Sequence, residues 1–283
     1  MKIIDPHLHL FDLKQGQYQW LKADKPPFWP DKHLIAKNFA EQDLALSSPL
    51  ELAGFVHIEA GFDNQQPWRE IAWLEHSCQL PFRSIAMLDI TLPSTLFSQQ
   101  LAKLMRYQSV VGIRHILDHD ALTILSNNNS QDNLAILAAN QLSFELQMLL
   151  TDTPALERFM AILTLTPKLK VCVNHAGWPS VDKSQAQLWL ENLKRLAKFK
   201  QVFIKCSGYE MLDRAYSAPW QYQIISQCIE AFAIERVMLA SNFPLSLLHS
   251  NYQNTWLSNT ELSFNAAQLQ QLCFSNAQGF YQF

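Results

Sequence analysis

The chain begins with the stretch KIIDPHLHLFD, residues 2–12, which carries two histidines one residue apart and opens the alternation of strands and helices that decides the fold. Side chains alternate between the two faces of a strand, so His7 and His9 point to one side and Leu8 and Leu10 to the other. Imidazoles at a strand's carboxyl end can hold a metal, polarise a carbonyl or move a proton. The pair alone is a weak motif, so its meaning depends on the rest of the chain.

Seven more short runs rich in Val, Ile, Leu and Phe follow, as expected for strands buried on both faces. Amphipathic segments separate them. This alternation predicts an α/β protein, a single-domain (β/α)₈ TIM barrel over residues 1–283. The alternative, an open doubly wound sheet, needs a glycine-rich phosphate turn, and the chain has 7 glycines and no GxGxxG. The predicted strands are 2–8, 52–59, 83–89, 110–116, 144–150, 170–175, 202–207 and 236–241; the predicted helices are 66–79, 93–106, 131–141, 153–164, 184–199, 217–232, 246–257 and 265–277.

Two regions depart from this alternation. Residues 12–50 form a long connection between the first two predicted strands and carry aromatic residues such as Trp20 and Trp29. A long aromatic loop at the carboxyl rim of a barrel is expected to form a lid or wall of the site. The polar stretch SNNNSQD, residues 126–132, is predicted to be a mobile surface loop.

Composition and charge narrow the function classes. The net charge of −3 (22 basic and 25 acidic residues) and the lack of a Lys/Arg run argue against a nucleic-acid partner. No apolar stretch reaches membrane-spanning length, so no membrane partner is expected. Five cysteines, an odd number without a CxxC pair, predict buried free thiols in a reducing, cytoplasmic compartment. The expected partner is a small-molecule substrate, and homo-oligomerisation stays open.

Polar side chains stand where the predicted strands end, and in a barrel those ends build the active site. The first and sixth strands supply His7, His9 and His175, which we predict to form one functional cluster. The other strand ends supply, in chain order, His57 and Glu59, Asp89, Arg114 or His115, Lys205 and Ser207, and Asn242.

Several of these residues have a structural alternative. A buried histidine satisfied by a backbone hydrogen bond is common, and His57 and His115 are each interpreted this way. Glu59 is a candidate acid or base, or else the ion-pair partner of Lys205 or Arg114. Arg114 is a candidate clamp for a substrate carboxylate or carbonyl, or else an ion-pair partner in the core.

Six segments in this order, DPHLHLFD, GFVHIEAG, GIRHIL, NHAGWP, KCSGYE and ERVMLASNFP, resemble the lactonase branch of the amidohydrolase-related hydrolases. That branch includes 2-pyrone-4,6-dicarboxylate lactonase, L-fuconolactonase and L-rhamnonolactonase, and the resemblance covers nearly the whole chain. It implies a (β/α)₈ barrel that hydrolyses a small lactone ring. The family's first-strand histidines fall on His7 and His9, its sixth-strand histidine on His175 and its eighth-strand aspartate on Asn242.

The asparagine at position 242 departs from that family. Lactone opening needs a nucleophilic water, stabilisation of the oxyanion and a proton for the leaving alkoxide. The resemblance implies that the aspartate takes the proton from water, and an amide has no basic lone pair for this task. Asn242 can still orient a water or a substrate, so the base is expected to be His175, His9 or Glu59.

Little dependence on metal is expected. The resemblance implies that members of this branch often work without a tightly bound metal. The fifth predicted strand offers Gln147 where a histidine would complete a binuclear centre. No cofactor is therefore required, and the alternative is weak zinc or manganese binding by His7, His9 and His175.

These observations predict a hydrolase that opens a small lactone, derived from a sugar acid or a dicarboxylate. The predicted catalytic residues are His7, His9, His175 and Asn242. The predicted substrate-binding residues are Glu59, Arg114, Lys205, Trp178 and Tyr209. The cations among them favour an anionic or oxygen-rich substrate, and the aromatic rings could stack on it. The alternative is a barrel without hydrolytic activity that binds a small carboxylate or sugar acid, because an amide replaces the family's aspartate.

Overall fold

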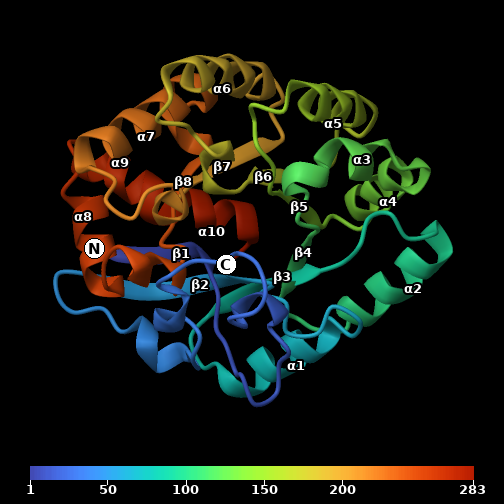
Figure 1. Ribbon diagram of the computed structural model, residues 1–283, viewed down its shortest axis with the longest axis horizontal. Helices are drawn as coiled ribbons and strands as arrows, with labels where there is room; N and C mark the ends of the chain where they lie inside the picture. Colours follow the sequence, from blue (N-terminus) through green and yellow to red (C-terminus); the bar gives the residue numbers. More distant parts are fainter.

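The computed structural model describes residues 1–283, which form a barrel of eight parallel strands ringed by helices (Figure 1). Each strand pairs with the next along the chain, so the predicted (β/α)₈ fold is confirmed. The barrel closes just after the last strand, where the Asn242 N–H donates to the His7 carbonyl at 2.9 Å and the His9 N–H donates to the Phe243 carbonyl at 2.7 Å. The strands are β1 (Lys2–Leu8), β2 (Glu51–Ile58), β3 (Phe82–Met87), β4 (Val110–Arg114), β5 (Ser143–Leu146), β6 (Val171–Val173), β7 (Val202–Cys206) and β8 (Val237–Leu239).

Helices cover the outside of the barrel, and several begin at a side chain that caps the first turn. Asp152, Asp182 and Ser217 each accept a hydrogen bond from a backbone N–H of the helix that follows. The helices are α1 (Trp68–Ser77), α2 (Ser94–Leu104), α3 (Ala121–Ser126), α4 (Asn128–Ala139), α5 (Thr153–Leu165), α6 (Lys183–Leu196), α7 (Ala218–Phe232), α8 (Tyr252–Thr260), α9 (Ala266–Gln270) and α10 (Asn276–Tyr281). None of them combines the length and the apolar character that crossing a membrane requires.

The prediction of a mobile surface loop over 126–132 is wrong. Helix α4 begins within this stretch, at Asn128. Asn127 is its N-cap, and the side-chain oxygen of Asn127 accepts a hydrogen bond from the Asn129 N–H at 2.9 Å. The polar residues therefore start a helix instead of interrupting one, because asparagine is among the most favourable N-cap residues.

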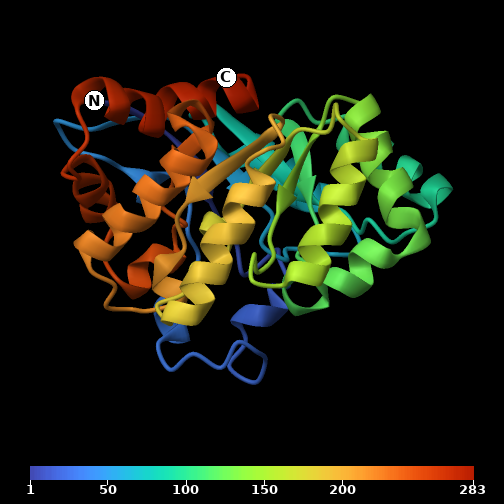
Figure 2. The same cartoon turned by 90° about the horizontal axis from the view of Figure 1, so that it is seen from above.

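The barrel interior is apolar at the end where the strands begin. Side chains such as Ile4, Val56 and Met238 fill this end of the barrel, and Phe280 and Tyr281 of α10 pack against them. Figure 2 shows α10 on the side of the molecule opposite to the long connection between β1 and β2. The strands therefore run from an apolar end of the barrel toward the end that carries the polar side chains. All five cysteines are buried and free, as predicted.

The connection between β1 and β2 is ordered by short 3₁₀ turns and contacts to the barrel. The Trp20 indole N–H donates to the Ala60 carbonyl at 2.8 Å. Phe39 packs against Phe243 after β8, with ring centroids 5.1 Å apart. A cavity of about 410 Å³ lies within the connection, and residues such as Phe28 and Trp29 line it; none of the predicted site histidines does.

Candidate active site

Three histidines meet at the carboxyl ends of β1 and β6, as predicted. His7 lies in β1, His9 follows it, and His175 opens the turn after β6. The His7 ring centroid is 5.2 Å from that of His9 and 4.6 Å from that of His175. Their exposed fractions are 0%, 6% and 3%, so the cluster is almost closed to solvent.

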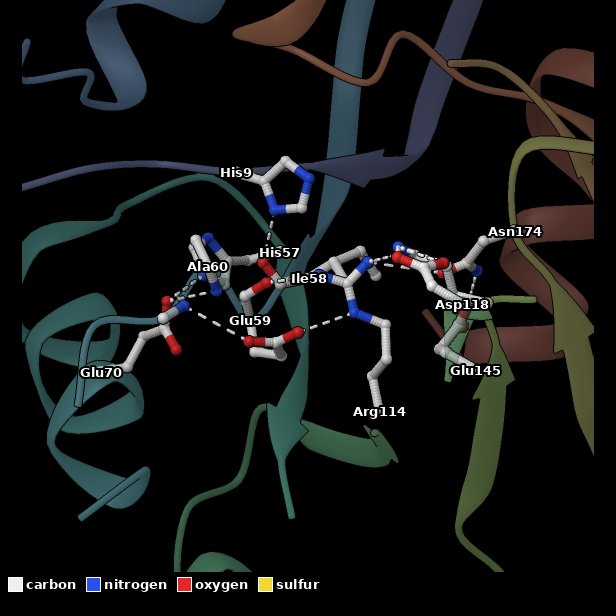
Figure 3. Close-up of polar contacts among 12 residues, drawn as sticks. His9, His57, Ile58, Glu59, Ala60, Glu70, Arg114, Asp118, Glu145 and Asn174 are labelled. Atoms are coloured by element: carbon white, nitrogen blue, oxygen red, sulfur yellow. Dashed lines mark hydrogen bonds and ion pairs between the residues drawn. The ribbon is translucent and has the colours of Figure 1, made fainter. Parts of the chain in front are cut away.

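The hydrogen bonds of the three rings differ. His9 Nδ1 lies 2.7 Å from the Ile58 carbonyl, a contact drawn as a dashed line in Figure 3. A carbonyl can only accept, so Nδ1 carries the proton, and Nε2 of the neutral ring is a free acceptor. His175 Nδ1 pairs with Ser207 Oγ at 3.1 Å. Neither nitrogen of His7 has a hydrogen-bond partner. A buried polar ring left open in this way is a feature of functional sites.

The backbone around His175 is held in the left-handed region. Residues from His175 to Trp178 all have φ between 51° and 68°. Such φ values cost free energy in non-glycine residues and cluster at active sites. In the turn after β7, Gly208 has φ +75°, and a Cβ there would lie 2.3 Å from His175 Nδ1. Gly208 therefore gives the imidazole the room that it occupies.

Burial keeps the three imidazoles neutral. It lowers the pKa of His7, His9 and His175 well below 6.5. The positive charge of Arg114 lowers all three pKa values further, and that of Lys205 lowers those of His7 and His175. Neutral rings can accept or donate one hydrogen bond each without carrying charge into the site.

Arg114 forms hydrogen bonds with Glu59 and Gln147 (Figure 3). Its Nε donates to Glu59 Oε1 at 2.8 Å, and its two terminal nitrogens donate to the Glu59 carbonyl at 2.7 Å and to Gln147 Oε1 at 2.8 Å. Arg114 and Glu59 are both buried. The ion-pair alternative considered for these two residues is thus formed, and their charges neutralise one another.

Lys205 pairs with a carboxylate that the sequence analysis missed. Its Nζ lies 2.7 Å from Glu145 Oε2 of β5, and neither side chain has any exposed surface. Asn174 Nδ2 and the Tyr281 hydroxyl also donate to Glu145, at 2.5 and 2.6 Å. Of the two ion-pair partners considered for Glu59, Arg114 therefore pairs with it and Lys205 does not.

His57 and Glu59 do not share a face, although they are two residues apart. His57 points outward to α1, where Nε2 lies 3.0 Å from Glu70 Oε1, and its Nδ1 accepts from the Leu10 N–H. Glu59 lies beyond the end of β2 and turns to Arg114. Alternation holds only inside a strand, so it does not extend to Glu59. The structural interpretation of His57 is confirmed.

Asn242 follows β8 and contacts a second missed carboxylate. Its Nδ2 donates to Glu210 Oε1 at 2.5 Å, whereas its Oδ1 is buried without a partner. The backbone of Asn242 lies in the left-handed region, with φ 57°, which is uncommon for a residue other than glycine. Glu210 lies in the turn Tyr209–Met211 after β7, and burial raises its pKa to about 7. The sequence signal was the acid in KCSGYE, directly after the seventh strand.

The two predicted aromatic residues occupy different environments. Trp178 packs 5.4 Å from the His175 ring, is partly exposed and lines a cavity of about 560 Å³ together with Asp118 and Leu149. Tyr209 is buried between Tyr216 and Trp220 and has no open face. The structure thus brings Trp178, but not Tyr209, to the edge of a space that a ligand could enter.

The histidine cluster, in the arrangement that it has in the structure, does not form a metal site. No group of three His, Cys, Asp or Glu side chains in the structure has an arrangement that could hold a metal ion. The residue where the family resemblance expects an aspartate is an amide. The residues present therefore do not fit a resident metal, and no step below uses one.

The amidohydrolase family profile matches residues 4–283. An uncharacterized protein of Sinorhizobium fredii is 28% identical, over 99% of this chain and 98% of that protein. An L-fucono-1,5-lactonase of Burkholderia ambifaria is 23% identical, over 88% of this chain and 86% of the lactonase.

Solved structures show the same fold. An amidohydrolase of Burkholderia multivorans with bound zinc superposes with a TM-score of 0.82 at 18% identity, over the whole of both chains. A probable 2-pyrone-4,6-dicarboxylic acid hydrolase of Acinetobacter baumannii with bound citric acid gives a TM-score of 0.69 at 18% identity, also over both whole chains. Identities this low establish a shared barrel and leave the chemistry to the residues of the site.

Proposed function

The chain belongs to the amidohydrolase family, and on that premise we propose that it is a hydrolase that opens a small lactone of a sugar acid or a dicarboxylate. The observation that carries the proposal is the cluster of three buried, neutral imidazoles at the strand ends, with His7 unbonded at both nitrogens. The relatives described as an L-fucono-1,5-lactonase and a probable 2-pyrone-4,6-dicarboxylic acid hydrolase support this class of substrate.

Each of the three histidine rings can take a different role in hydrolysis, because their hydrogen bonds differ. His7 has a free N–H, which can donate to the lactone carbonyl and stabilise the oxyanion. His9 presents an unprotonated Nε2, which can orient the attacking water. His175 is fixed through Ser207, and Asn242 Oδ1 offers a further acceptor for water or substrate.

The predicted binding residues contribute to this proposal in different ways. Trp178 adjoins both His175 and the cavity and is placed to pack on a ring. Arg114, Lys205 and Glu59 set the electrostatic environment through their ion pairs. Tyr209 would act only indirectly, because its ring is buried.

The experiment is a panel of aldonolactones and dicarboxylate lactones, with consumption followed by NMR. We expect turnover of at least one lactone and its loss in His7→Ala, with His76→Ala, an exposed histidine on α1, as the matched control. Folded protein that consumes no lactone of the panel above the buffer rate would contradict the proposal.

The second candidate is a barrel that binds a sugar acid or small carboxylate without hydrolysing anything. It is favoured by the amide at position 242 and by the low exposure of the histidines. A thermal-shift screen would then find a stabilising acid that is not consumed. Asn242→Asp discriminates the two: a gain of activity from none supports a binding protein, whereas loss of existing activity supports a mechanism that uses the amide.

A further inference from the structure

Position 242 lacks a carboxylate, and another carboxylate lies against it. Glu210 Oε1 accepts a hydrogen bond from Asn242 Nδ2 at 2.5 Å. Glu210 is 2% exposed and Asn242 is fully buried. We propose that Glu210 is the general base of the lactone hydrolysis proposed above, supplying from the turn after β7 the carboxylate that Asn242 cannot supply from the end of β8.

Glu210 is connected to the histidine cluster through two neighbours, Ser207 and Asn242. Three residues before it, Ser207 bonds His175 Nδ1 at 3.1 Å. On the other side, its partner Asn242 donates a backbone hydrogen bond to the His7 carbonyl at 2.9 Å. The carboxylate therefore belongs to the same strand ends as the imidazoles and is not a surface group of α7.

Glu210 differs from the other buried glutamates near the site. Glu59, Glu70 and Glu145 are bonded by Arg114, His57 and Lys205, respectively. The one side chain that donates to the Glu210 carboxylate is the neutral amide of Asn242. Arg114 and Lys205 neutralise Glu59 and Glu145, and a carboxylate neutralised by a cation is a weak proton acceptor. Glu70 has no cation, but it lies on α1 outside the barrel and accepts from the His57 ring and the Ala60 N–H. Glu210 is therefore the acid–base group of this set that remains available beside the histidine cluster.

The charged and titratable groups around the Glu210 carboxylate are compatible with its role as a general base. The groups that face Glu210 are the guanidinium of Arg214 and the phenol of Tyr216. Arg214 bonds Asp31 at 2.7 Å and the backbone carbonyl of Glu210, and so leaves the carboxylate itself unpaired. Burial raises the pKa of Glu210 to about 7, whereas it lowers the pKa values of the three histidines. A base works best when its pKa is close to the working pH.

In the proposed reaction Glu210 acts first as a general base and then as a general acid. Glu210 takes one proton from water while the water oxygen forms a bond to the lactone carbonyl carbon, and the carbonyl electron pair moves to its oxygen. When the tetrahedral intermediate collapses, the ring C–O bond breaks and protonated Glu210 returns its proton to the leaving alkoxide. The product is a hydroxy acid, which loses its own acidic proton to solvent, and Glu210 is regenerated as the carboxylate.

The test compares wild type with Glu210→Gln, Glu210→Asp and the double variant Glu210→Gln/Asn242→Asp, using L-fucono-1,5-lactone and the panel above between pH 5 and 9. The matched control is Glu230→Gln, an exposed glutamate on α7. We expect Glu210→Gln to lower kcat about 10²- to 10⁴-fold with KM within a few-fold, as for loss of a general base. The double variant should recover activity, because it moves the carboxylate to position 242.

Two results would overturn the assignment. One is Glu210→Gln within threefold of wild type, and the other is a Glu210→Gln profile that keeps the limb near pH 7. If wild type consumes no lactone, the proposed function fails, and infrared difference spectra of wild type against Glu210→Gln then test the carboxyl group itself. A protonated-carboxyl band that titrates near neutral pH and is missing in the variant supports Glu210 as the proton acceptor of the site; its absence refutes that role.

Discussion

Replacing Glu210 by glutamine should remove a pH-dependent loss of stability. Burial raises the Glu210 pKa from 4.5 to about 7 in the folded protein. Between these values the folded state keeps a proton that the unfolded state has released, so the wild-type free energy of unfolding falls as pH rises. The span of about 2.5 pKa units corresponds to about 3 kcal/mol, at about 1.4 kcal/mol per unit. The stabilisation is complete below pH 4.5 and lost above pH 7.

The assay is urea unfolding of both proteins between pH 4.5 and 8. The difference in free energy of unfolding, Glu210→Gln minus wild type, should rise by about 3 kcal/mol over this range. Every other titrating group is common to both proteins and cancels in the difference. Glu230→Gln, a surface change, should give a flat difference. A flat or falling difference for Glu210→Gln would show that Glu210 ionises normally and would refute the reasoning.

Three further predictions concern the support of the site. Lys205→Met leaves the buried Glu145 carboxylate without a counter-charge and should cost about 3–5 kcal/mol in urea unfolding, more than the double variant with Glu145→Gln. A loss below about 1 kcal/mol would contradict it. Gly208→Ala places a methyl group 2.3 Å from His175 Nδ1 and should destabilise by about 1–3 kcal/mol and abolish turnover, whereas Gly279→Ala, with open space around it, should do neither. After dialysis against a chelator, metal analysis should find no stoichiometric zinc or manganese, and a tightly retained ion would contradict the metal-poor site.

The barrel was predictable because its strands carry their own signal. Four of the six residues in the run 202–207 are apolar, and β7 (Val202–Cys206) lies within one residue of that range. The ends were less accurate where the chain turns into the site. The predicted strand 170–175 contains β6 (Val171–Val173) and then continues into the His175 turn, whose left-handed backbone depends on tertiary contacts.

The candidate site was predictable in its histidines and, apart from Glu59, not in its carboxylates. His7, His9 and His175 could be placed together because each follows from a strand end. Glu145 and Glu210 could not, because a buried acid is explained only by its partners, here Lys205 and Asn242 from other strands. Sequence spacing does not show which distant side chains meet.

The pairing of the buried cations bears on the substrate. From the sequence, Arg114 and Lys205 favoured an anionic or oxygen-rich ligand, yet Arg114 is bonded to Glu59 and Lys205 to Glu145. A substrate carboxylate would have to displace one of these carboxylates and leave it unpaired in the interior, at a cost of several kcal/mol. The neutral imidazoles need only hydrogen-bond to a carbonyl. We therefore infer that the site favours an uncharged sugar-acid lactone over a dicarboxylate lactone, with the only new negative charge arising on the oxyanion during the reaction.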